Sequence, residues 1–316
     1  MANLSRINTL EQDKHRRRKK DVITGGVGNV ATKAIGTASL VLATQALYVG
    51  LTTPRLKPPL NSGSNFEPNG LVIKFTDGVR IDSNNNDSHL QSEEIRVILI
   101  GDSPVEGIGN ETHRQAMGGQ TAFALMNLFK KSVRYWSLGK SGLTAGGIQN
   151  EMVPLMRNIS SRFKIDLVVV SCGVNNVLSG HSASAFGCEL DSLLDSINSC
   201  RFGSNVPIIL LGLLDFSHMP FLPFPLCSVA GWRSRTLQKE MEKTVERRSL
   251  ERTITIAQMP DVDTILNNTK HPLLKNADIE DGEKLEIDDF FADDGFHPAK
   301  YGTIMLGNLL SQTYKE

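Results

Sequence analysis

The chain has 316 residues, of which 40% are hydrophobic and 22% are charged, and its 34 basic and 34 acidic side chains give a formal net charge of zero. This length accommodates one large α/β domain with additional N-terminal residues. The balanced charge gives no indication of a nucleic-acid-binding protein, so we expect no nucleic-acid partner. The four cysteines form no CxxC pair and show no metal-ligand spacing, which indicates neither a disulfide framework nor a zinc site.

Residues 1–33 form a polar N-terminal tail that contains a basic run at 15–20. The stretch 34–54 that follows has no charged residue, and a helix of this length reaches about 30 Å, enough to cross the hydrocarbon core of a bilayer. We interpret 34–54 as a membrane anchor. The basic run would stay in the cytosol, which predicts a single-pass membrane protein whose remaining residues lie in a lumen or outside the cell. An organellar transit sequence or an amphipathic surface helix is the alternative.

Residues 55–94 have the composition of a linker. They include Pro58, Pro59 and Pro68 and the polar tract at 82–88, and such segments do not bury enough apolar surface to fold alone. Within this linker, the five residues 71–75 could form a short strand.

From residue 95 onward, apolar runs alternate with amphipathic segments. The predicted strands are 95–101, 133–138, 166–172, 206–213 and 253–257. The predicted helices are 115–130, 146–162, 182–199, 232–250 and 299–313. Alternation of this kind produces a parallel sheet that is covered by helices on both faces and connected by right-handed crossovers. We therefore expect a three-layer α/β/α sandwich with a five-stranded parallel sheet.

Residues with chemical potential follow these predicted strands. Ser103 comes directly after the first strand, at the edge of the sheet where α/β proteins bind ligands. A serine hydroxyl becomes a nucleophile when an imidazole removes its proton, and His297 is the best candidate for this base. Asp294 stands three residues before His297 and is suited to accept the other imidazole N–H, although geometry alone does not exclude Asp293.

Four stretches of the sequence, taken in order, resemble the four conserved blocks of the SGNH (GDSL-type) hydrolases, in an esterase- or lipase-like branch. They are Gly101-Asp102-Ser103, Ser137 to Thr144, Gly173-Val174-Asn175-Asn176, and Asp294 to His297. The resemblance spans roughly 95–310 and implies an SGNH hydrolase domain at 95–316 with flavodoxin-like strand order. Two departures are Pro104 where the family has Leu, and Asn176 where it has Asp.

The resemblance implies a serine hydrolase that cleaves carboxylic esters through an acyl-enzyme. Ser103 would be the nucleophile, His297 the base and Asp294 the acid that orients it. The oxyanion hole would consist of the backbone N–H groups of Ser103 and Gly142 and the side chain of Asn175. Neither a metal nor a cofactor is expected, and the partner would be a small-molecule or lipid ester.

The loop at 215–226 follows the fourth predicted strand and is restricted by three prolines. We expect its Phe221 and Phe224 to bind substrate and to favour short to medium acyl chains over acetyl.

Three other functions compete with this interpretation. A Rossmann-type nucleotide binder is disfavoured because the glycines after the first strand lack the G-x-G-x-x-G spacing. Metal-dependent hydrolysis would use the acidic residues at 288–294 together with His297, but only one histidine is present there. A non-catalytic SGNH-fold binding protein at a membrane is the third alternative.

Overall fold

The computed structural model of the chain describes residues 39, 41–59, 70–73, 94–200, 206–248, 254–280 and 283–315. The chain divides into two units, Met1–Thr52 and Thr53–Glu316. In the first unit, residues 41–52 are helical. Among the described residues, no helix is both long and apolar enough to cross a membrane. The basic run at 15–20 and part of the predicted anchor lie outside the described residues, so the anchor and its orientation stay predictions.

The second unit is built on a six-stranded sheet with the order β1-β3-β2-β4-β5-β6. Its strands are β1 Leu71–Ile73, β2 Ile95–Gly101, β3 Val133–Gly139, β4 Leu167–Ser171, β5 Ile208–Leu211 and β6 Ile254–Ala257. Strands β2 to β6 are parallel, whereas β1 pairs antiparallel with β3. The predicted parallel sheet and its flavodoxin-like order are confirmed, and β1 makes the strand count six instead of five.

The central strands are apolar along their whole length because helices cover both faces of the sheet. Residues 97–100 of β2 and 167–170 of β4 are all fully buried. Continuous apolar runs of this kind are typical of parallel strands, whereas a half-exposed strand would alternate.

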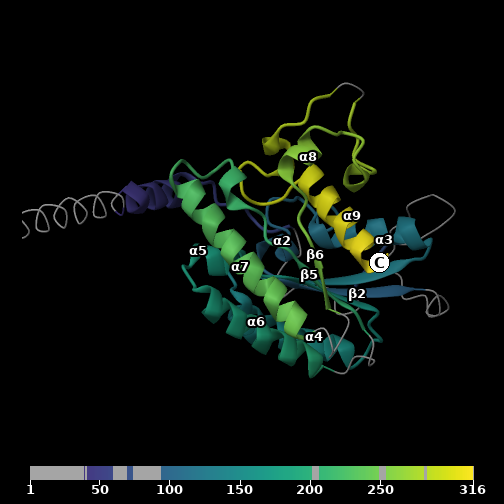
Figure 1. Cartoon of the computed structure of the whole chain (residues 1–316). Helices are drawn as coiled ribbons and strands as arrows, with labels where there is room; N and C mark the ends of the chain where they lie inside the picture. The colour runs from purple at the N-terminus through teal and green to yellow at the C-terminus, as the bar shows by residue number, and fades with distance from the viewer. Residues whose placement is uncertain are drawn as a thin grey trace, which may run out of the picture. The chain divides into compact units, whose positions relative to one another are not determined.

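Helices form the two outer layers. They are α2 Ser103–Glu106, α3 Met117–Phe129, α4 Ala145–Ser160, α5 Val174–Leu178, α6 Ala183–Asn198, α7 Leu226–Arg248, α8 Val262–Leu266 and α9 Tyr301–Lys315, with 3₁₀ turns η3 Phe216–His218, η4 Pro272–Leu274 and η5 Ile287–Phe290. Helices α3 and α9 pack together on one face, and α4, α6 and α7 cover the other (Figure 1). The five predicted helices are confirmed, except that α7 begins at Leu226 instead of at residue 232.

Part of the predicted linker belongs to the sheet. Strand β1 pairs Leu71 with Tyr135 and Ile73 with Val133. Gly70, just before β1, has a φ of +78°, and a Cβ there would lie 2.7 Å from a ring atom of Trp136. The short strand therefore lies against Trp136 and covers the edge of β3, which would otherwise expose unpaired backbone groups.

Candidate active site

Ser103 lies at the carboxyl end of β2, where the chain turns into the short helix α2. The turn is tight because a Cβ on Gly101 would come within 2.5 Å of the Ser171 carbonyl oxygen in the neighbouring strand. Ser103 is only 4% exposed. Within the described part of the chain, neither its hydroxyl nor its backbone N–H makes a hydrogen bond. The candidate nucleophile is therefore buried, and no hydrogen bond within the described residues holds its hydroxyl.

Asp294 and His297 form a close pair in the loop before α9. The Nδ1 atom of His297 lies 2.5 Å from Oδ2 of Asp294. The other carboxylate oxygen, Oδ1, accepts hydrogen bonds from the backbone N–H groups of Phe296 and His297. Burial alone would raise the pKa of Asp294, but these hydrogen bonds outweigh it and hold the pKa below its usual value. Asp293 is exposed, so the pair involves Asp294 alone.

The second ring nitrogen of His297 faces no partner. Its Nε2 atom is buried and has no hydrogen-bond partner among the described residues. The Asp294 carboxylate is suited to accept a hydrogen bond from Nδ1–H, and this arrangement leaves Nε2 as the ring atom that can accept a proton. His297 and Ser103 both line one cavity at the end of the sheet. A buried, unsatisfied acceptor of this type is uncommon and points to a functional role.

The three hydrogen-bond donors predicted for the oxyanion hole differ in whether they already have a partner. Gly142 has a φ of +84° and lies in an exposed turn after β3, and its N–H makes no hydrogen bond within the described residues. The Asn175 amide is occupied, because Nδ2 donates to the carbonyl oxygen of Leu143 at 3.0 Å and to Oδ2 of Asp102 at 3.3 Å. Two backbone donors are thus free, while the side-chain donor is held by neighbours.

Asp102 is a site residue whose role the sequence did not reveal. Its carboxyl group is fully buried and accepts hydrogen bonds from the Ser171 hydroxyl at 2.9 Å and from Asn175. Burial raises the pKa of Asp102 to about 7, although these hydrogen bonds and nearby His297 act to lower it. The only sequence signal was its position between Gly101 and Ser103, which does not show that Ser171 and Asn175 would enclose it.

Asn176, the departure from the family's Asp, is buried in a polar network beside the site. Its Oδ1 accepts the Ala145 N–H at 3.0 Å, at the start of α4. Its Nδ2 lies 2.9 Å from Oε2 of Glu189 and 2.9 Å from Nδ1 of His181. The same Glu189 oxygen accepts the Gly146 N–H at 3.0 Å. The carboxylate near the first turn of α4 is therefore supplied by Glu189, and Asn176 links it to the helix.

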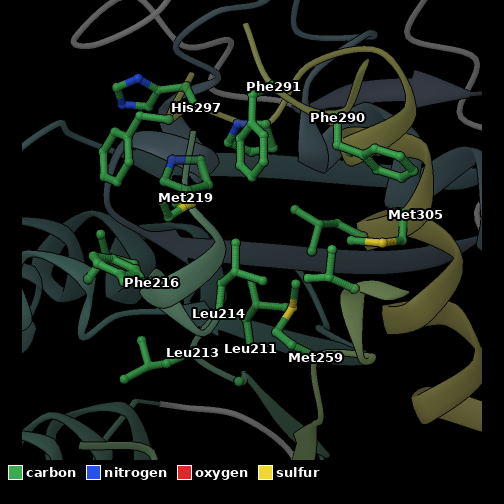
Figure 2. Close-up of a pocket in the computed structure, with 18 of the residues that line it drawn as sticks. Leu211, Leu213, Leu214, Phe216, Met219, Met259, Phe290, Phe291, His297 and Met305 are labelled. Atoms are coloured by element: carbon green, nitrogen blue, oxygen red, sulfur yellow. The ribbon is translucent and has the colours of Figure 1, made fainter. Parts of the chain in front are cut away.

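The cavity beside Ser103 and His297 has a volume of about 960 Å³, its open mouth included. Apart from Ser103, Ser171, Cys172 and His297, its lining side chains are apolar or glycine. Figure 2 shows many of them, drawn from the ends of β5 and β6, from η3 and η5, and from α9. Among the described residues, no group of three or more histidine, cysteine, aspartate or glutamate side chains could hold a metal ion.

The loop at 215–226 reaches this cavity through other residues than those predicted. Phe216 and Met219 line it, whereas neither Phe221 nor Phe224 does. Phe224 is 78% exposed. Phe221 instead packs on the ring of Phe296 at 4.9 Å, next to His297. Phe221 therefore supports the loop that carries the histidine, and substrate binding by Phe221 and Phe224 stays a prediction.

The description of the matching family fits this site. Residues 99–303 match the model of the GDSL-like lipase/acylhydrolase family. The chain belongs to this family. That membership makes the protein a carboxylic ester hydrolase and agrees with the resemblance seen in the four sequence blocks. No curated protein matches the hydrolase.

Solved structures of lipases and esterases are similar to this chain at low sequence identity. A lipase from a goat rumen metagenome is 15% identical, with a TM-score of 0.50, and the match covers 69% of this hydrolase and 97% of that chain. A lipase/acylhydrolase from Enterococcus faecalis is 18% identical, with a TM-score of 0.47 and coverage of 69% and 94%. A family 3 carbohydrate esterase from Clostridium thermocellum is 14% identical, with a TM-score of 0.48 and coverage of 70% and 95%.

Proposed function

We propose that the hydrolase cleaves carboxylic esters through a covalent acyl-enzyme formed on Ser103. The observation that carries the proposal is the state of His297: Nδ1 is held by Asp294, and Nε2 is buried, unpartnered and on the same cavity as Ser103. A base in this state is ready to accept a proton from a hydroxyl beside it.

In the first half of the reaction, Nε2 of His297 takes the Ser103 proton as Oγ attacks the ester carbonyl carbon. The C–O bond to the alcohol then breaks, and the proton on Nε2 passes to the leaving alkoxide oxygen. In the second half, the same nitrogen activates a water that releases the carboxylic acid and returns the proton to Ser103. Asp294 stabilises the imidazolium that forms in each half and keeps the ring oriented.

The negative charge on the tetrahedral intermediate would be received by the N–H groups of Ser103 and Gly142. We propose that Asn175 joins them by sharing the hydrogen that it donates to Asp102. At 3.3 Å this bond is slightly longer than the usual range for N–H···O hydrogen bonds, so it is weaker than the 3.0 Å bond to Leu143. Loss of one oxyanion donor typically reduces kcat by about 10² to 10³.

The experiment is labelling with a fluorophosphonate, which reacts with activated serines, combined with hydrolysis of p-nitrophenyl esters. Wild-type protein should be labelled at Ser103, and Ser103→Ala and His297→Ala should lose ester turnover by several orders of magnitude while staying folded. Asp293→Asn is the matched control for Asp294→Asn, since Asp293 is exposed. Wild-type turnover in Ser103→Ala would refute the mechanism, and turnover equally reduced in both aspartate variants would refute the role of Asp294.

A further inference from the structure

The cavity at the site has one polar end and one apolar end. The Ser171 hydroxyl already donates to Asp102, and the Cys172 thiol is buried at the end of β4. Beyond Ser103, Ser171, Cys172 and His297, the remaining lining side chains have no hydroxyl, amide or charge that could recognise a sugar or a polar acyl group. Polar groups buried there would lose their hydrogen bonds to water without replacement, which is costly. The apolar end is therefore suited to hydrocarbon.

The apolar end is also closed. Ile265 of α8, Phe290 of η5, and Met305 and Leu306 of α9 line it, and each is between 3% and 9% exposed. Figure 2 shows Phe290 and Met305 on the opposite side of the cavity from His297, with Leu211 and Met259 between and below. A ligand group that enters beside Ser103 can thus extend away from His297 until it meets these side chains.

The mechanism decides which part of an ester takes this direction. The leaving alcohol must lie beside Nε2 of His297, because that atom gives it a proton. The acyl substituent stays bonded to Ser103 throughout the acyl-enzyme stage and therefore extends to the other side. The closed end lies away from His297, so it matches the acyl substituent and not the alcohol.

We propose that this cavity binds the acyl chain of the substrate, and that the chain is an unbranched acyl group longer than butyryl. The inference rests on the proposed acyl-enzyme function. It moves acyl selection from the 215–226 loop to the closed end, the far wall of the cavity, where Met305 acts as a specificity-determining residue. Each methylene that leaves water for the cavity contributes about 0.8 kcal/mol, so kcat/KM should rise up to roughly fourfold per added carbon until the chain reaches the wall.

The test measures kcat/KM on p-nitrophenyl acetate, butyrate, octanoate and laurate at concentrations below micelle formation. Wild-type protein should favour octanoate over butyrate at least tenfold. Met305→Phe fills the far wall and should lower the laurate-to-butyrate ratio at least tenfold, whereas Met305→Ala should raise it. Met156→Ala is the matched control, because Met156 is a fully buried methionine in α4, on the other face of the sheet. It should lower stability and leave the ratio unchanged.

A binding measurement covers the case in which Met305→Phe does not fold. The Ser103→Ala protein should gain thermal stability from free laurate and not from butyrate, because a ligand that binds only the folded state raises the unfolding temperature. A wild-type preference for acetate or butyrate, or a chain-length dependence that follows the alcohol part of butyrate esters, would overturn the inference. In either case loss of turnover in Ser103→Ala would still support the acyl-enzyme, while turnover in that variant would refute the proposed function itself.

Discussion

Replacing Asn176 with aspartate tests the polar network that joins α4 to the region of Asn175. The substitution restores the residue type of the family at this position but places a second carboxylate 2.9 Å from Oε2 of Glu189. Two unit charges at this distance repel by about 6 kcal/mol at an effective dielectric constant of about 20. Glu189 has a side chain 27% exposed, so solvent screening reduces this value, and we expect a loss of about 2 to 4 kcal/mol at pH 8.

The loss should depend on pH. The repulsion raises the pKa of one carboxyl group in the folded state above its unfolded value, so the penalty is small at low pH and grows as the pH rises through that raised pKa. At pH 5 we expect a loss of only about 1 kcal/mol.

Thermal unfolding at pH 5 and pH 8 measures the effect. At pH 8 the Asn176→Asp variant should unfold about 5 to 15 °C below wild type. The double variant N176D/E189Q should recover most of that difference, because glutamine removes the like charge and can still accept from the Gly146 N–H. The reasoning is refuted if N176D unfolds at the wild-type temperature at pH 8, or if the double variant is no more stable than N176D.

Three further predictions concern other parts of the hydrolase. Burial raises the pKa of the Asp102 carboxyl group to about 7, so its contribution to stability is fully present below the unfolded pKa near 4 and is lost as the pH rises to 7. Wild type should therefore lose stability relative to Asp102→Asn between pH 4 and pH 7. Above pH 7 the difference between their unfolding temperatures should be constant. A chain that begins at Glu94 lacks β1 and exposes Trp136, so it should unfold at a lower temperature and aggregate more readily than a chain that begins at Thr53; equal stability of the two would mean that β1 contributes nothing. If 34–54 is a membrane anchor, full-length protein should stay with membranes through an alkaline carbonate wash, and recovery of intact chain in the soluble fraction would contradict the anchor.

The strands could be predicted because a continuous apolar run is visible in the local sequence and does not depend on which distant residues pack against it. Residues 97–100 and 167–170 are continuous apolar runs that end at a turn, which is what burial on both faces of a parallel sheet requires. The start of α7 was missed because Pro223, Phe224 and Pro225 suggested a loop. Helix α7 begins directly after Pro225, in agreement with the tolerance of proline at the first positions of a helix.

In the site, the pairing of two residues could be predicted from the sequence, whereas the cavity could not. The spacing of Asp294 and His297 predicted their pairing, since three residues suffice for the aspartate to reach back to the ring. The cavity could not be predicted because its far wall comes from η5 and α9, and nothing in Phe290 or Met305 marks either residue as lining the same cavity as Ser103. Short elements such as α8 were missed for a related reason: their stability comes from packing, not from an amphipathic repeat long enough to recognise.

The order of the chain also determines when this hydrolase becomes active. Ser103 belongs to the first third of the sequence, but His297 and the α9 side chains that wall the cavity belong to the last twenty residues. Helix α9 packs on α3, which precedes it by most of the domain. During synthesis the polypeptide therefore contains its nucleophile long before it contains its base. The apolar side chains of the cavity stay uncovered until α9 packs on them. Such non-local closure slows folding and prolongs exposure of aggregation-prone surface. Premature termination near the C-terminus should consequently produce an inactive, chaperone-dependent protein even though the whole sheet has been synthesised.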